Sequence, residues 1–221
     1  MEDWGLRKMT RIHVIDRTNR DSYQDILDEY FRLRYEIFVN ERGWRDLHQI
    51  DGREIDDYDN DDAIYLLALD GDRVVGGQRL YPTVLPHMLS EVFGHMAPRG
   101  LPKAQHVLEW TRYFVVKERR MGRTDCRLLA AIQQFCLEEG ITEVTAVVEM
   151  WWLPRWHQAG FKVKPLGLPT VIEGQPCIAA SIEISQQSLD RVCGLAGLRS
   201  SALVRNAPLR GPLNRVPHVA A

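Results

Sequence analysis

The sequence predicts an α/β fold in which a mixed, mainly antiparallel sheet carries helices on both faces. Two strand-like runs, 63–69 and 73–81, meet at an Asp-Gly-Asp turn, which is typical of an antiparallel hairpin. A strand at 107–116, a helix at 124–140 and a strand at 142–149 predict a parallel pair with a right-handed crossover. The crossover helix and a helix in the first forty residues supply the two covering layers.

The first sixty residues predict a strand, a long helix and an acidic loop. Residues 12–15 alternate as a short strand, and Asn19 is placed to cap a helix over 20–39 whose apolar residues recur at helical spacing. Periodicity then stops over 41–62, where seven Asp and Glu residues accumulate between 51 and 62. A solvated loop and a ligand-binding loop are both open for this segment.

The second half of the chain supplies the crossover helix, and Thr124 or Asp125 caps its start. Gly140 ends it. A short helix is expected at 88–93 and another at 153–159.

Two last strands are expected at 161–164 and 177–184. Beyond 187 the chain is rich in Arg, Pro, Gly and Ala, which predicts a loose or peripheral tail over 187–221. We expect a single catalytic domain over 1–221.

Composition excludes several classes of protein. The chain has 221 residues, of which 45% are apolar and 26% charged, so it can build one full core. A net charge of −2 without a basic run gives no reason to expect a nucleic-acid partner. No segment has the length of a membrane span or the pattern of a signal peptide, so we expect no membrane association.

The four cysteines are not spaced in pairs, which argues against a disulfide framework and a zinc site. We therefore expect a cytoplasmic protein.

Several charged residues lie within apolar runs. Arg34, Arg79, Glu109 and Arg112 are each flanked by hydrophobic residues, and a charge buried there must be paired or must serve a ligand. Glu109 and Arg112 have opposite parity on one predicted strand, so they share a site only if a β-bulge intervenes.

Two short segments resemble turns of the GNAT acetyltransferase superfamily. Residues 119–124 (Arg-Arg-Met-Gly-Arg-Thr) lie between a strand and a helix and resemble its pyrophosphate-binding turn, with Thr124 at its last small position. Residues 156–161 (Trp-His-Gln-Ala-Gly-Phe) resemble its late aromatic and Gly-Phe turn. The resemblance implies a GNAT-like three-layer α-β-α sandwich and a thioester donor.

More specific blocks resemble the LuxI-type acyl-homoserine lactone synthases. They are 33–38 (Leu-Arg-Tyr-Glu-Ile-Phe) with Trp44, 54–59 (Glu-Ile-Asp-Asp-Tyr-Asp), Arg79 with 81–83 (Tyr-Pro-Thr), 92–93 (Val-Phe) and 109–115 (Glu-Trp-Thr-Arg-Tyr-Phe-Val). They follow the family's order over about 12–185. The resemblance implies that the chain N-acylates S-adenosylmethionine and closes the lactone with release of methylthioadenosine, without a cofactor or metal.

Glu109 and Arg112 are the expected catalytic residues, with Glu109 as the base that deprotonates the α-ammonium group, although a simple Glu109–Arg112 ion pair is the alternative. Glu54 is expected to organise the loop. Residues expected to hold S-adenosylmethionine are Arg34, Phe38, Trp44, Asp56, Asp59, Arg79 and Arg112.

Around 149–155 and 164–169 the chain resembles the subgroup that uses branched or aryl acyl-coenzyme A. The expected acyl and thioester site comprises Phe114, Val115, Ala146, Met150, Trp151 and Trp152. A backbone N–H near Phe114 or Val115 is expected to stabilise the oxyanion. Arg119, Arg120 and Arg123 are expected to bind phosphate, and the sequence leaves coenzyme A and acyl carrier protein both open as donors.

Two other functions compete with the synthase. A GNAT-type N-acyltransferase acting on another amine would keep the phosphate turn without needing the acidic loop. A non-catalytic domain that binds acyl thioesters would turn nothing over.

Overall fold

A computed structural model describes residues 10–44, 46, 47, 49–201 and 203–205. The expectations for the amino-terminal stretch and for the tail beyond 205 lie largely outside these residues. In the described part, nine strands form one sheet in the order β11-β1-β4-β5-β6-β7-β10-β8, and β9 pairs with β10. Its strands are β1 (Arg11–Ile15), β4 (Ile64–Asp70), β5 (Arg73–Pro82), β6 (Val107–Val115), β7 (Glu143–Glu149), β8 (Val163–Pro165), β9 (Thr170–Ile172), β10 (Gln175–Glu183) and β11 (Leu203–Val204).

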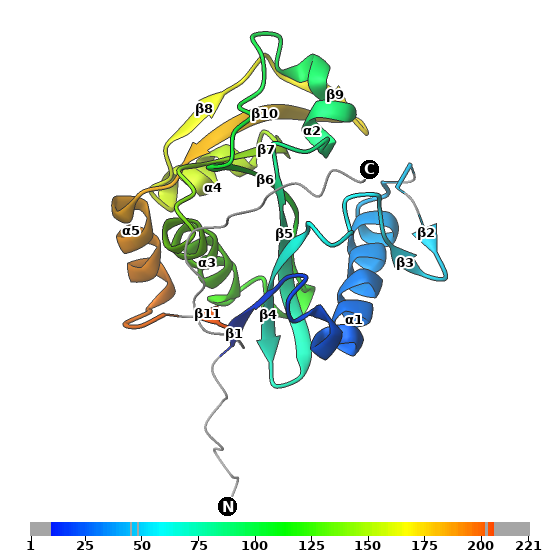
Figure 1. The fold of residues 1–221 in the computed structure, drawn as a ribbon, viewed down its shortest axis with the longest axis vertical. Helices are drawn as coiled ribbons and strands as arrows, with labels where there is room; N and C mark the ends of the chain where they lie inside the picture. Colours follow the sequence, from blue (N-terminus) through cyan, green and yellow to red (C-terminus); the bar gives the residue numbers. More distant parts are fainter. Residues whose placement is uncertain (1–9, 45, 48, 202, 206–221) are drawn as a thin grey trace, which may run out of the picture.

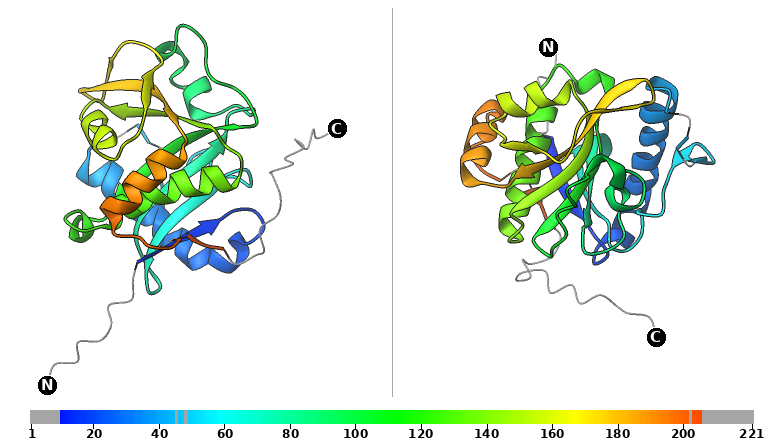
Figure 2. Two further views of the ribbon diagram at one scale, coloured as in Figure 1. Left: turned by 90° about the vertical axis from the view of Figure 1, so that its left-hand side faces the viewer. Right: turned by 90° about the horizontal axis from the view of Figure 1, so that it is seen from above.

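Helices cover both faces of this sheet, and the predicted three-layer α/β fold is confirmed (Figures 1 and 2). One face carries α1, and the other carries α3, α4 and α5. The helices are α1 (Gln24–Arg34), α2 (Met88–Glu91), α3 (Thr124–Glu138), α4 (Trp152–Gln158) and α5 (Gln186–Ala196), while β2 (Gln49–Ile50) and β3 (Arg53–Glu54) form a separate small hairpin.

The central strands are apolar throughout because both of their faces are covered. Six of the seven residues of β4 are buried, which suits a strand between two helical layers. On β5, Gly77 lets α1 approach closely, since a Cβ there would lie 2.7 Å from the ring of Tyr30 and from Leu67. This approach brings the end of α1 down onto the sheet.

The predicted helix over 20–39 is three segments. A 3₁₀ turn (Arg20–Tyr23) precedes α1, and a π-helical segment (Tyr35–Glu41) follows it. Asn19 does not cap the helix through its side chain; its Oδ1 accepts a hydrogen bond from the backbone N–H of Asp16. The π-helical segment carries Phe38 toward the sheet, where it is buried.

The segment after 187, expected to be a loose or peripheral tail, is not loose in its described part up to 205. Helix α5 begins at a cap in which Ser185 Oγ accepts a hydrogen bond from Ser188 N–H, and it ends at Gly197 with φ +65°. Val192 joins the main core, and β11 pairs in parallel with β1. Composition predicted a loose tail because the segment is rich in Arg and Gly, and the few apolar residues that it buries form no clear pattern in the sequence.

Candidate active site

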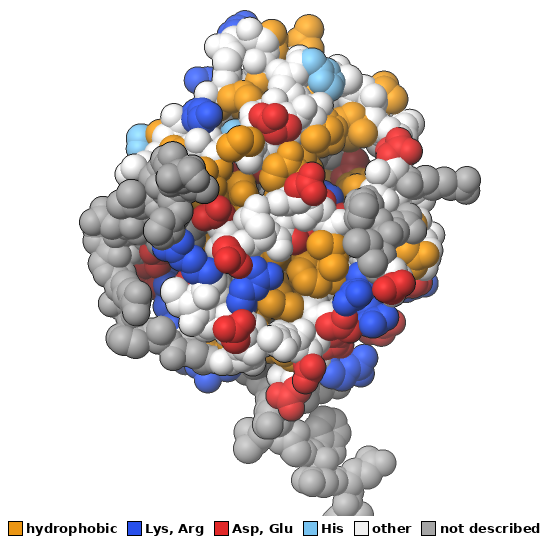
Figure 3. All heavy atoms as spheres, turned by 45° about the vertical axis from the view of Figure 1, so that its right-hand side comes forward, with side chains coloured by type: hydrophobic (Ala, Val, Ile, Leu, Met, Phe, Trp, Pro, Cys, Tyr) orange, Lys and Arg blue, Asp and Glu red, His pale blue; other side chains and the backbone are white. Residues whose placement is uncertain are grey.

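The sheet splits at its centre. Strands β6 and β7 pair in parallel from Val107 and Glu143 to Glu109 and Thr145, and no later pairs form between them. A cavity of about 590 Å³ lies at this split, lined by the residues that follow on both strands. Figure 3 shows apolar side chains gathered around a hollow on this side of the molecule, with acidic side chains near its rim.

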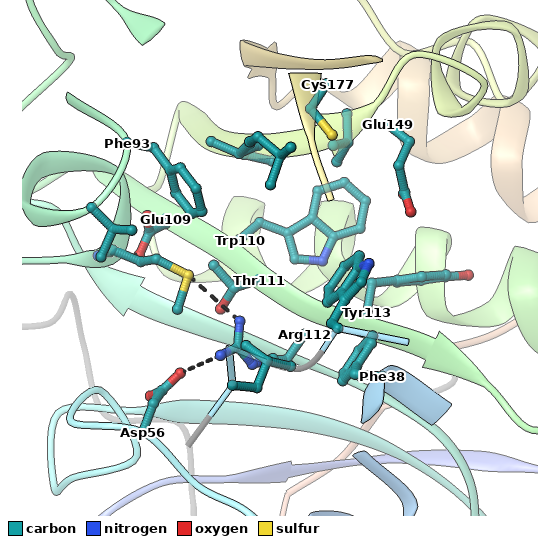
Figure 4. A pocket seen from close by; sticks show the side chains of 18 of the residues that line it. Phe38, Asp56, Phe93, Glu109, Trp110, Thr111, Arg112, Tyr113, Glu149 and Cys177 are labelled. Carbon is teal, nitrogen blue, oxygen red and sulfur yellow. Dashed lines mark hydrogen bonds and ion pairs between the residues drawn. The ribbon is translucent and has the colours of Figure 1, made fainter. Parts of the chain in front are cut away.

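The wall of the cavity combines aromatic and charged side chains from both halves of the chain (Figure 4). Its lining residues include Phe38, Arg42, Trp44, Asp56, Tyr58, Met88, Phe93, Glu109, Trp110, Thr111, Arg112, Tyr113, Ala146, Val148, Glu149, Trp152, Trp156 and Cys177.

Glu109 is a buried carboxylate at this wall, 2% exposed. It accepts hydrogen bonds from the backbone N–H groups of Met88, at 3.1 Å, and Leu89, at 2.5 Å. Burial raises the pKa of Glu109 above its ordinary value, although His87 and these N–H groups act in the opposite direction. It does not pair with Arg112 among the ion pairs of the described residues, so the alternative of a simple Glu109–Arg112 pair is wrong.

A β-bulge resolves the parity of Glu109 and Arg112. The β5–β6 register shifts between Gly77 and Arg79, whose partners are Phe114 and Thr111, so two residues of β6 face the single residue Gln78. Arg112 takes a left-handed backbone conformation there, with φ +54°. The bulge allows both side chains to reach the cavity (Figure 4).

Beneath the cavity, three arginines and three carboxylates form a buried ion network. Arg34 donates to Glu54 at 2.5 Å and to Asp59 at 2.7 Å. Arg79 donates to both oxygens of Asp56, at 2.5 and 3.0 Å. Arg112 donates to Glu54 at 2.9 Å.

Arg112 also joins the two ends of this network by donating to Asp56 at 2.7 Å. Arg34, Arg79, Glu54 and Asp59 have fully buried side chains, so their charges compensate one another out of water.

The network explains which acids stay ionised. Burial alone would raise the pKa of Asp59, but Arg34 and Arg79 hold that pKa well below its usual range. Arg34 and Arg112 likewise lower the pKa of Glu54 against the effect of burial. Of the six network residues, only Asp56 and Arg112 line the cavity, so they are the members placed to touch a ligand.

An aromatic stack forms another part of the wall. The rings of Phe38 and Trp44 lie parallel, with centroids 5.2 Å apart. The guanidinium of Arg42 lies 5.4 Å from each ring and 3.5 Å from a carboxylate oxygen of Glu149 on β7. The stack therefore joins the segment after α1 to the far strand of the split.

A further part of the cavity wall is a cluster of aromatic rings from β6 and α4. Trp152 meets Tyr113 edge to face at 5.0 Å, and Trp110 stacks on Trp156 at 5.2 Å. Ala146, with no hydroxyl group, lies on β7 among the lining residues. These residues shape a compact apolar compartment.

The predicted phosphate turn lies before α3. Arg119 pairs with Asp70, and Arg120 pairs with Glu41. Arg123 is exposed and has no acidic partner within the described part of the chain. Its guanidinium lies against Gly197 at the end of α5, so the turn carries one cation that has no ion-pair partner among the described residues.

Not every predicted site residue reaches the cavity. Phe114 packs in the core between Tyr30 and Phe38, with ring centroids 5.6 and 6.1 Å away. Val115 is buried beside it along β6. Met150, Trp151, Arg34, Asp59 and Arg79 are likewise absent from the lining.

Some residues that line the cavity were not predicted from the sequence. Arg42 follows Phe38 by four positions, a helical spacing that signals a shared face. Trp110, Tyr113 and Trp156 stand inside the quoted motifs and read as core residues. No sequence pattern pointed to Met88. Its sulfur accepts a hydrogen bond from Arg112 at 3.5 Å.

In the described part of the chain, no group of three His, Cys, Asp or Glu side chains is placed to hold a metal ion. Among the same residues, no helix is long and apolar enough to cross a membrane.

Comparison with known proteins identifies the family. An autoinducer synthase family model matches residues 18–192. The chain belongs to the autoinducer synthase family. It is 53% identical over 190 residues to the isovaleryl-homoserine lactone synthase of Bradyrhizobium diazoefficiens, covering 86% of this chain and 87% of that protein. It is 29% identical to an acyl-homoserine-lactone synthase of Agrobacterium fabrum, covering 83% and 90%.

Solved structures agree with this assignment. A coenzyme A-dependent acyl-homoserine lactone synthase with S-adenosylmethionine and isopentyl-coenzyme A has 50% identity and a TM-score of 0.87, covering 90% of this chain and 94% of that one. A putative N-acetyltransferase from Lactobacillus plantarum, at 19% identity and a TM-score of 0.55, shares the fold, covering 79% of this chain and 99% of that one.

Proposed function

We propose that this protein is an acyl-homoserine lactone synthase that joins S-adenosylmethionine to a short branched acyl group delivered by coenzyme A. The supporting observation is the split between β6 and β7, where a buried carboxylate, a sulfonium-compatible aromatic pair and an apolar compartment line one cavity. The acyl group follows the isovaleryl-homoserine lactone synthase to which the chain is similar, and the donor follows the similar coenzyme A-dependent synthase structure. Four free thiols are compatible with a cytoplasmic protein.

In the first step, Glu109 takes a proton from the α-ammonium group of S-adenosylmethionine, directly or through a water molecule. The raised pKa of Glu109 makes it a stronger base than an exposed carboxylate. The freed amine attacks the thioester carbonyl, a C–N bond forms, and the C–S bond breaks to release the coenzyme A thiol. The backbone N–H groups of β6 near Phe114 and Val115, whose side chains lie outside the cavity, stay the predicted donors to the oxyanion.

In the second step, the carboxylate oxygen of the new amide attacks the γ-carbon of the methionine moiety. A C–O bond closes the lactone, and the C–S⁺ bond breaks to release methylthioadenosine. The sulfonium is already a good leaving group because its departure removes a positive charge. Phe38 and Trp44 present ring faces that favour a cation at this place.

The residues of the ion network have different proposed roles. Asp56, whose side chain is 13% exposed, is the proposed ligand of the ammonium or ribose groups. Arg34, Arg79 and Asp59 are proposed to hold Asp56 and its loop in place, and Glu54 is proposed to organise the loop. Arg112 joins the network to the cavity and is the motif arginine placed to meet the methionine carboxylate.

The proposed acyl compartment lies among Trp110, Tyr113, Ala146, Trp152 and Trp156. Four aromatic side chains leave little room for a long chain, which favours a short branched or aryl group. Without a hydroxyl on Ala146, the wall offers no side-chain donor there for an oxo substituent.

The test incubates the purified protein with S-adenosylmethionine and a panel of acyl-coenzyme A and acyl-carrier thioesters, followed by mass spectrometry. We expect an acyl-homoserine lactone and methylthioadenosine in equal amounts, with isovaleryl-coenzyme A among the best donors. Thioester consumption without methylthioadenosine would instead indicate a GNAT-type acyltransferase for another amine. No consumption of any thioester would favour the non-catalytic alternative.

A further inference from the structure

Trp151 has no role in the cavity, although it was expected in the acyl site. It is 55% exposed and is the only exposed tryptophan in the described residues. One face of its indole stacks on Trp152, with centroids 4.6 Å apart and planes 27° apart. The other face has no aromatic partner among the described rings, so a rigid apolar surface is left open to solvent.

The indole lies near the predicted phosphate turn. Trp152, its stacking partner, meets the ring of Tyr113, whose hydroxyl donates to Asp125 at 2.5 Å in the first turn of α3. Arg155 pairs with the same Asp125. Trp151 is the residue before α4, and Arg155 follows it by four residues, about one helical turn later. Trp151 is thus linked, through Trp152 and Tyr113, to the end of α3 where the turn lies.

The turn carries one cation without an ion-pair partner, which suits a phosphate group. Arg123, two residues before Asp125, is exposed and has no acidic partner in the described residues, whereas Arg119 and Arg120 are ion-paired. Coenzyme A carries an adenine ring together with several phosphate groups. The phosphopantetheine arm of a carrier protein has one bridging phosphate and no base, so it cannot use a stacking surface.

We propose that the open face of Trp151 stacks on the adenine of acyl-coenzyme A while Arg123 contacts its phosphates. Stacking of a base on an aromatic side chain is favourable and tolerates imprecise geometry. Trp151 is then a donor-selecting residue that holds the nucleotide outside the cavity, and it contributes to the choice of coenzyme A over a carrier protein. The inference rests on the proposed function as far as acyl transfer is concerned. Binding of the nucleotide does not depend on it.

Trp151→Ala tests the proposal, with a truncated donor as the internal comparison. We expect KM for isovaleryl-coenzyme A to rise about tenfold, equivalent to ~1.4 kcal/mol, with kcat close to that of the wild type. KM for isovaleryl-pantetheine, which has the same thioester and no nucleotide, is expected to stay unchanged. Trp151→Phe should recover part of the loss, and Leu168→Ala, at an 84% exposed apolar residue, should change neither donor.

Calorimetric titration with free coenzyme A and free pantetheine separates this inference from the proposed function. We expect Trp151→Ala to weaken coenzyme A binding about tenfold and to leave pantetheine binding unaltered, even if the wild type makes no lactone. An equal loss for both donors would mean that Trp151 acts through Trp152 on the acyl compartment and would overturn the proposal. An unchanged affinity for coenzyme A would overturn it as well.

Discussion

Replacing Glu54 by Gln should reveal how much stability the buried ion network holds. Glu54 is fully buried and accepts hydrogen bonds from Arg34 at 2.5 Å and from Arg112 at 2.9 Å. The substitution keeps the shape but removes one negative charge, leaving three arginines against two carboxylates. Breaking a buried ion pair on one side costs ~3–5 kcal/mol because the remaining charge is uncompensated. For a chain of this size, that corresponds to a fall in Tm of roughly 6–20 °C.

The assay is thermal and urea unfolding followed by circular dichroism at several pH values. The folded pKa of Glu54 is depressed, so its contribution is complete above the unfolded pKa and is lost as pH falls. The wild type should therefore lose stability below about pH 4, and the Glu54→Gln variant should lose less over the same interval. Asp57→Asn, at an exposed position of the same loop, serves as the control. A Glu54→Gln variant within ~1 kcal/mol of the wild type at pH 7 would refute the reasoning.

Three further predictions concern the chemistry. Glu109→Gln should lower kcat at least about a hundredfold with little change in Tm, whereas Glu91→Gln on the exposed side of α2 should not; equal rates would remove Glu109 as the base. Because the pKa of Glu109 is raised, kcat should fall as pH drops through that raised pKa, and this acidic limb should vanish in Glu109→Gln. Trp152→Ala should enlarge the apolar compartment and shift kcat/KM toward bulkier acyl-coenzyme A donors, and an unchanged donor profile would contradict its place in the wall.

The sequence by itself determined the fold class and most of its elements. The Asp-Gly-Asp turn and the apolar periodicities are local signals, so they located β4, β5, β6, α3 and β7 within a few residues. The motif blocks also contain the residues that meet in the network, since Arg34, Glu54, Asp56, Asp59, Arg79 and Arg112 all lie within them. Their meeting follows from burial, because charges within apolar segments need partners.

Only the tertiary structure decided which of these residues face a ligand. The bulge that turns Arg112 into the cavity depends on the register of β6 against β5, and register is set by pairing between distant segments. Tertiary packing also decides the places of Trp151 and Trp152. They are adjacent in the chain, but Trp151 lies outside the cavity and Trp152 lines it. Sequence spacing fixes which residue types are available, whereas the packing of helices on the sheet fixes the direction in which each side chain points.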